Sequence, residues 1–205
     1  RLCTPGLVDA HTHLVFGGWR EHELALKLQG VPYLDILARG GGILSTVRAT
    51  RAAGEDELAD KALRQLQHML ALGVTTCECK SGYGLDTENE LKQLRVTRTL
   101  QTRQPITLVS TFMGAHALPE EYKGDREGYI DLLIREMLPQ VAAEGLADYC
   151  DVFCEQGVFS AEESRRILTA AQALGMGAKV HADEVEAIGG SRVAGEIGAI
   201  SAEHL

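Results

Sequence analysis

This sequence has no long apolar run and no block of basic residues. None of its hydrophobic segments reaches the roughly 18 residues that a membrane-spanning helix needs. Its 20 Lys and Arg residues stand against 29 Asp and Glu residues, and the net charge of -9 repels nucleic-acid phosphates and anionic lipid. We therefore expect neither a nucleic-acid nor a membrane partner, and a soluble protein of the cytoplasm.

Paired cysteine motifs are also missing. The five cysteines include no CxxC and are an odd number, in a chain of 205 residues that is large enough to bury a core without disulfides. Cys77 and Cys79 are two residues apart in a β-branched segment, so we place them on one face of a strand. The cysteines thus indicate reduced thiols in a reducing compartment.

The glycine motifs of nucleotide-binding proteins are absent as well. No GxGxxG follows the first strand-like segment, and no GK[ST] follows Gly40-Gly41-Gly42. This disfavours a nucleotide-binding α/β domain. We interpret the three glycines as a flexible loop.

What the chain does contain is a regular alternation of short apolar segments and longer amphipathic ones. The amphipathic segments predict helices over 55–72, 87–100, 126–144 and 160–174. The spacings Thr87 to Glu90 and Ser160 to Glu163 both fit a capping box at a helix start. The apolar segments predict strands over 7–10, 74–79, 107–112, 148–153, 177–180 and 199–202.

Strands that alternate with helices form parallel sheets, which are either open and doubly wound or closed into a barrel. Polar and metal-binding residues recur just past the predicted strand ends, namely His11, His13, Tyr83, His116, Glu155, His181, Glu184 and His204. An open sheet would spread them along its edge at about 4.8 Å per strand, whereas a barrel brings them to one mouth. We therefore predict an α/β fold of the TIM-like (β/α)8 type, containing about the first six strands.

His11 and His13 are the first candidates for a metal site. Because side chains alternate along a strand, both imidazoles point to the same side and can bind one cation. Two histidines at this spacing also occur on protein surfaces, but His181 and His204 at later strand ends favour a metal site. Neutral imidazoles suit Zn or Fe.

The segment from Pro5 to His13, PGLVDAHTH, resembles the first-strand signature of the amidohydrolase superfamily, and the resemblance spans the whole chain. It implies one divalent metal held by His11, His13 and His181, with His204 in a catalytic role. A further Asp ligand is implied on an eighth strand, beyond these residues. Cys154-Glu155 stand where binuclear members carry a modified lysine, so the resemblance implies a mononuclear site.

Six further blocks of sequence resemble the imidazolonepropionases within that superfamily: 19–23 (WREHE), 29–33 (QGVPY), 40–43 (GGGI), 80–84 (KSGYG), 112–116 (FMGAH) and 180–184 (VHADE). The family hydrolyses 4-imidazolone-5-propanoate to N-formimino-L-glutamate in histidine degradation. The resemblance implies a homodimer and a longer protein, in which two more strands close the barrel and a β-sandwich domain flanks it. We accordingly interpret residues 1–205 as an excerpt of a catalytic barrel.

The resemblance also implies roles for the remaining candidates. A bound metal lowers the pKa of water from about 15.7 to about 7, and the hydroxide attacks the ring. We expect Glu184 to contact the substrate and to move the proton as general base and then acid, with Asp183 as its rival. Arg20 and Tyr83 would bind the propionate, since the guanidinium fork pairs with a carboxylate.

His116 would hydrogen-bond the ring carbonyl. By spacing alone Arg20 is a solvated surface residue, so its role depends on the resemblance. For His116 the alternative is a structural histidine, and the small residues before it favour contact with a ligand. Two alternatives stay open: another cyclic amidohydrolase or aminohydrolase, similar to guanine deaminase, that acts on a ring without a carboxylate, or a non-catalytic metal-binding barrel fragment. Arg20 and Tyr83 discriminate against the first alternative.

Overall fold

The computed structural model describes residues 3–32, 35–36 and 40–205; Tyr33, in the second of the six blocks, lies outside the described residues. Within this part of the chain, six parallel strands form one sheet in sequence order. The strands are β1 (Leu7–Asp9), β2 (Val74–Lys80), β3 (Thr107–Ala115), β4 (Tyr149–Cys154), β5 (Gly177–Ala182) and β6 (Ser201–Glu203). The predicted parallel α/β architecture and all six predicted strands are confirmed.

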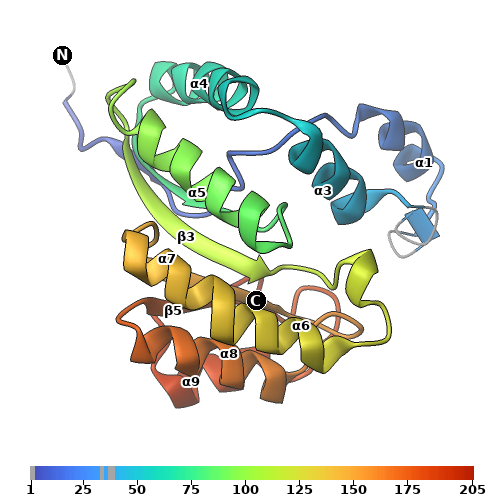
Figure 1. Ribbon diagram of the computed structural model, residues 1–205. Helices are drawn as coiled ribbons and strands as arrows, with labels where there is room; N and C mark the ends of the chain where they lie inside the picture. Colours follow the sequence, from blue (N-terminus) through green and yellow to red (C-terminus); the bar gives the residue numbers. More distant parts are fainter. Residues whose placement is uncertain (1–2, 33–34, 37–39) are drawn as a thin grey trace.

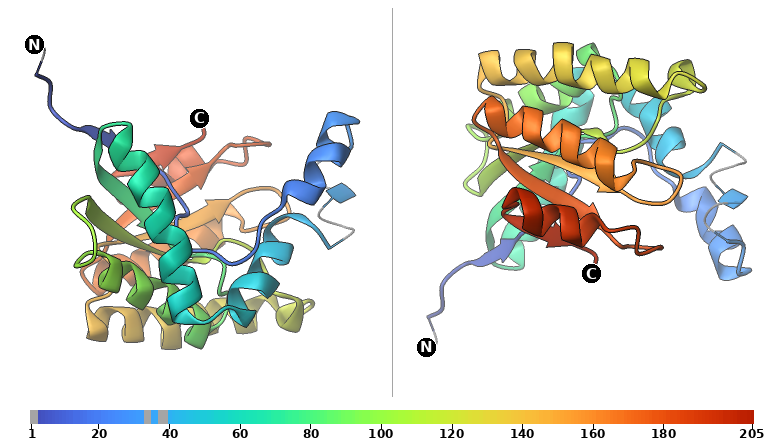
Figure 2. Two further views of the ribbon diagram at one scale, coloured as in Figure 1. Left: turned by 90° about the horizontal axis from the view of Figure 1, so that it is seen from above. Right: turned by 90° about the horizontal axis from the view of Figure 1, so that it is seen from below.

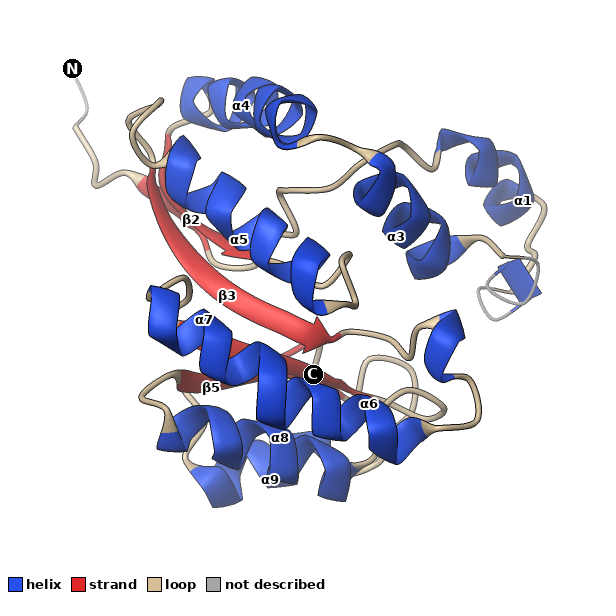
Figure 3. Ribbon diagram, in the orientation of Figure 1, coloured by secondary structure: helices blue, strands red, loops and turns tan. Residues whose placement is uncertain are grey.

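Helices connect the strands, and those from residue 55 onward pack on the outside of the curved sheet, whereas the helices Leu24–Leu28 and Gly42–Ala52 lie to one side of it (Figures 1 and 3). In both views of Figure 2 the sheet curls so that β1 and β6 lie near each other, as in an incomplete barrel. The helices are α1 (Leu24–Leu28), α3 (Gly42–Ala52), α4 (Glu55–Ala71), α5 (Thr87–Leu100), α6 (Arg126–Leu132), α7 (Leu138–Glu144), α8 (Ala161–Ala173) and α9 (Gly190–Ile197).

The capping predictions had different outcomes. Ser160 caps α8 with the predicted capping box, in which Glu163 binds back to the Ser160 amide. At α5 the prediction was wrong: the cap is Asp86, which accepts a hydrogen bond from the Asn89 amide at 2.7 Å. Glu90 is instead buried and accepts hydrogen bonds from backbone amides of the loop after β2.

Two helical segments differ from the prediction. The interval 126–144 is not one α-helix, because a π-helical turn, Leu133–Met137, separates α6 from α7. The three glycines are not simply a flexible loop, because Gly42 begins α3 and its amide donates to the buried Glu23 carboxylate at 2.7 Å. The local sequence around Gly42 does not predict this acceptor, because it lies 19 residues away.

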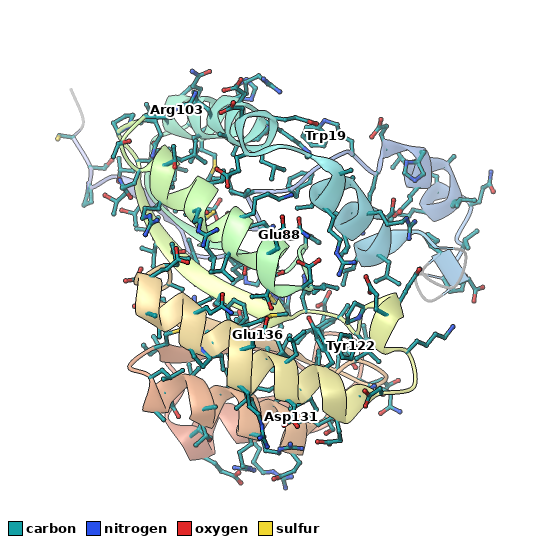
Figure 4. The ribbon with its side chains drawn as sticks, in the orientation of Figure 1. Trp19, Glu88, Arg103, Tyr122, Asp131 and Glu136 are labelled. Carbon is teal, nitrogen blue, oxygen red and sulfur yellow. The ribbon has the colours of Figure 1, made fainter. Side chains whose placement is uncertain are left out.

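Two apolar clusters hold the helices on the sheet. The larger one includes Phe112, Tyr129, Phe159 and Ile167, and the smaller one packs α4 against β2 through Leu58 and neighbouring residues. Charged side chains are exposed on the outer helical surfaces, including Glu88, Asp131 and Glu136, and in the turn after α5, where Arg103 lies (Figure 4). Among the described residues, no helix is both long and apolar enough to cross a membrane.

Candidate metal and active site

A cavity of about 270 Å³ lies at the carboxyl ends of the strands. Its lining contains every residue that the sequence predicted for the site: His11, His13, Arg20, Tyr83, His116, His181, Glu184 and His204. These residues follow five different strands, so their meeting requires the strand ends to converge. The apolar side chains of Ile43, Phe153 and Val185 complete the wall.

Three histidines in this cavity form a group that can hold a metal ion. One ring nitrogen from each of His11, His13 and His181 lies within 4.8 Å of the others. The Nε2 atoms of His13 and His181 are 3.4 Å apart. Burial, and then the neighbouring His116 and His181 rings, lower the pKa of His13 well below its usual value, so the ring stays neutral and can donate a lone pair.

The other nitrogen of each ring lies close to an oxygen atom outside the cluster. The Nδ1 atom of His11 contacts the Glu203 carboxylate, and that of His181 lies 2.9 Å from Oδ2 of Asp151. The Nδ1 atom of His13 lies 3.4 Å from the carbonyl oxygen of Ser81. Such partners fix the orientation of a ring and leave Nε2 for a ligand, as is usual for metal-binding histidines.

Beneath the histidines lies a buried network of charged side chains: Glu78, Lys80, Asp151, Lys179 and Glu203. Burial raises the pKa of Asp151, but the facing His181 and Lys80 outweigh it and bring the value to about 2. Burial likewise opposes the charge of Glu203, yet hydrogen bonds from His11 and Lys179 hold its pKa well below the usual range. The sequence had suggested no role for these residues. An Asp within the buried strand YCDVFC nevertheless indicates that its carboxylate has a partner, because a buried charge is costly unless it is paired.

Glu184 and His204 face each other at the rim of the cavity. The His204 Nε2 atom lies 4.0 Å from a Glu184 oxygen, and the His204 ring centroid is 4.7 Å from that of His11. The carboxylate of Asp183, the rival of Glu184, is instead hydrogen-bonded at the start of α9. It accepts a hydrogen bond from the Ser191 hydroxyl at 2.5 Å, which lowers its pKa.

Glu155, just past β4, holds the loop that carries Glu184. Its buried carboxylate accepts hydrogen bonds from the Val185 amide at 2.8 Å and from the Glu186 amide at 3.1 and 3.2 Å. Glu155 does not line the histidine cavity. Its strand-end position was visible in the sequence, but its partners were not.

The loop after β1 carries Arg20 and is held by Lys61 of α4. The Lys61 ammonium lies 3.4 Å from the ring centre of Phe16 and 3.9 Å from that of Trp19, and it also donates to the Gly18 carbonyl. Trp19 lies beside α4 in Figure 4. Burial lowers the pKa of Lys61 to about 8. Among the described residues, the buried Nη1 atom of Arg20 has no hydrogen-bond partner.

His116 is buried and stacks on His13 with ring centroids 4.8 Å apart. Burial, and then the nearby His181, lower its pKa to about 3. Its Nδ1 atom lies 2.9 Å from the Gly82 carbonyl, which only accepts, so Nδ1 carries the proton. The Nε2 atom of the neutral ring is therefore an acceptor.

Comparison with curated proteins shows which enzymes this chain resembles. The chain is 62% identical over all 205 residues to the imidazolonepropionase of Alkaliphilus metalliredigens, and 61% identical to those of Fusobacterium nucleatum and Streptococcus sanguinis. Over its whole length, this chain is similar to the imidazolonepropionases. It spans about half the length of these relatives, 49% in each case. A scan against protein-family profiles finds no match.

Imidazolonepropionase-like sequence blocks supply much of the cavity wall, through Arg20, Tyr83, His116 and His181. The fold itself is shared with more distant enzymes. The 5-methylcytosine deaminase of Klebsiella pneumoniae matches 88% of this chain and 40% of its own with a TM-score of 0.61 at 18% identity. An amidohydrolase from Burkhoderia ambifaria, solved with bound Zn, matches 88% of this chain and 52% of its own with a TM-score of 0.54 at 18% identity. The α/β fold of a TIM-like barrel, with six parallel strands among the described residues, is thus confirmed as the fold class.

Proposed function

We propose that the protein containing this chain hydrolyses 4-imidazolone-5-propanoate to N-formimino-L-glutamate, with one divalent metal ion. The observation that carries the proposal is a cavity in which a three-histidine metal cluster occurs together with the Nη1 atom of Arg20, which has no hydrogen-bond partner among the described residues. The cluster suits metal-assisted hydrolysis, and the guanidinium suits the carboxylate of a propionate group. The identity of about 60% to imidazolonepropionases supports the same substrate.

His11, His13 and His181 would hold the metal, which when bound supplies a water molecule that is acidic enough to ionise near neutral pH. The donor set of three imidazoles accepts either Zn or Fe. The Zn in the amidohydrolase of similar fold supports a divalent ion. We further propose that the remainder of the protein supplies the Asp ligand, two closing strands and a β-sandwich domain.

Glu184 is suited to move the proton during ring opening. Its carboxylate lies at the cavity rim, where it can accept a proton from the attacking water and return it to the departing ring nitrogen. His204, 4.0 Å from that carboxylate, can hold the water or the ring oxygen in position. Asp183 lacks this freedom because it binds Ser191.

Arg20 and Tyr83 would bind the propionate, and His116 would orient the ring. The tautomer of His116 changes one expectation from the sequence. Because its Nε2 atom is an acceptor, it suits a ring N–H of the substrate rather than the ring carbonyl.

Arg20→Met in the full-length protein tests the substrate assignment. Loss of a hydrogen bond to a charged group costs about 1.5–3 kcal/mol, so we expect KM for 4-imidazolone-5-propanoate to rise about ten- to a hundredfold. Metal content should be unchanged. Arg64→Met, the same change at an exposed position of α4, is the control. An unchanged KM in the Arg20 variant would favour a ring substrate without a carboxylate.

A further inference from the structure

Lys80 is the central residue of the charged network below the histidines. Its side chain is completely buried at the end of β2. The ammonium lies 2.7 Å from Asp151, 3.0 Å from Glu78 and 3.2 Å from Glu203. Burial opposes its charge, but these three carboxylates, Asp151 foremost, raise its pKa, so the group stays protonated.

Two of these carboxylates also contact the metal-binding rings, and they do so through the same oxygen atoms. Oδ2 of Asp151 binds the Lys80 ammonium and lies 2.9 Å from Nδ1 of His181. Oε2 of Glu203 contacts the ammonium and Nδ1 of His11. One ammonium therefore connects to two of the three imidazoles, each through a single shared oxygen.

We propose that Lys80 is a positioning residue of the metal site, whose ammonium fixes the two carboxylates that orient His11 and His181. The inference rests on the proposed function, since it requires that these histidines bind a metal. Asp151, His181 and Glu203 form a second group that is able to hold a cation, and the ammonium contacts both of its carboxylates. Lys80 thus also fills the place of a second metal ion and keeps the site mononuclear.

The direction in which metal affinity changes when the ammonium is removed distinguishes this positioning role from electrostatic repulsion alone. A buried positive charge near a metal site repels the ion, so its removal alone would tighten metal binding. If the ammonium instead holds the carboxylates in place, its removal lets the rings turn and weakens binding. Loss of such supporting contacts lowers metal affinity about 10- to 100-fold.

Lys179 provides a matched control within the same network. Its ammonium lies 2.8 Å from Glu78 and 2.9 Å from Oε1 of Glu203, but no contact with Asp151 is recorded for the described residues. Lys179→Met removes the same charge from the same cluster. It leaves the Lys80 to Asp151 to His181 connection intact.

The test is a Zn²⁺ titration of the metal-free full-length protein against a competing chelator, with circular dichroism to verify folding. We expect Lys80→Met to weaken Zn²⁺ binding about 10- to 100-fold and Lys179→Met to weaken it by much less. Wild type and Lys179→Met should bind one ion per chain, and a second, weaker ion in Lys80→Met would support the idea that the ammonium occupies its place. Binding of the first ion by Lys80→Met that is as tight as wild type or tighter would overturn the inference, as would an equal loss in both variants.

A charge-balanced double variant, compared with its single variant, tests the inference if Lys80→Met does not fold. Glu78 contacts Lys80 and accepts from Thr111 at 2.6 Å, but touches neither imidazole among the described contacts. Lys80→Met/Glu78→Gln should therefore bind Zn²⁺ about 10- to 100-fold more weakly than Glu78→Gln alone, and equal affinities would overturn the inference. Failure of the wild-type protein to bind Zn²⁺ would instead contradict the proposed metal site itself.

Discussion

Adjacent acidic residues in this protein have different environments, and the difference assigns their roles. Asp183 is tied to Ser191 at the start of α9, whereas Glu184 reaches the cavity rim near His204. The sequence placed both residues after β5 and favoured Glu184, with Asp183 as its rival. The catalytic role is assigned to Glu184 because the Asp183 carboxylate is hydrogen-bonded to Ser191, outside the cavity.

We predict that Glu184→Gln lowers kcat by a hundredfold or more, because general acid-base catalysis contributes about 10²–10⁴. Metal content should stay at the wild-type level. Asp183→Asn is the matched control; it should lower the melting temperature while kcat changes only a few-fold. Steady-state kinetics with thermal unfolding measures both, and a larger kcat loss in the Asp183 variant would reverse the assignment.

Residue types with strong chemical preferences were predictable from the sequence, and their partners were not. His11, His13 and His181 stand out because they follow strands at metal-binding spacing, and all three line the cavity. Asp151 and Glu203 were missed because each matters through a histidine on another strand. Glu203 contacts His11 across 192 positions of sequence, a pairing that no local pattern reveals.

At the scale of secondary structure, a side chain at the end of one strand holds the loop that follows the neighbouring strand. The Glu155 carboxylate after β4 binds the Val185 and Glu186 amides between β5 and α9. The strands were predictable because runs of β-branched and apolar residues lie between helix signals. The start of α3 at Gly42 and the π-helical turn at Leu133–Met137 were not, since tertiary contacts and helix irregularities leave little trace in local composition.

We predict that Glu155→Ala loosens the loop that carries Glu184. Loss of two or more backbone hydrogen bonds, each contributing about 0.5–1.5 kcal/mol, should speed hydrogen exchange of residues 183–188 by about tenfold or more. The kcat should fall while metal affinity is retained. Gln156→Ala, at the exposed neighbouring position, is the control. Wild-type exchange in the Glu155 variant would show that the loop is held by other contacts.

At the scale of the whole molecule, the curvature of the sheet creates the site. Residues after β1, β2, β3 and β5 and at the end of β6 meet in one cavity because the sheet curls and its first and last strands approach each other (Figure 2). The alternation of strands and helices predicted a parallel sheet, and the polar residues just past the strand ends favoured a barrel over an open sheet. The buried charge network depends on the exact register of neighbouring strands, which periodicity does not specify.

The most direct test of the proposed activity is an assay of the full-length protein with 4-imidazolone-5-propanoate, before and after metal removal by a chelator and again after Zn²⁺ or Fe²⁺ is added back. We predict hydrolysis to N-formimino-L-glutamate that chelation abolishes and that one metal ion per chain restores. A metal-loaded protein that leaves the imidazolone intact, or a metal-free protein that hydrolyses it at the full rate, would contradict the proposal.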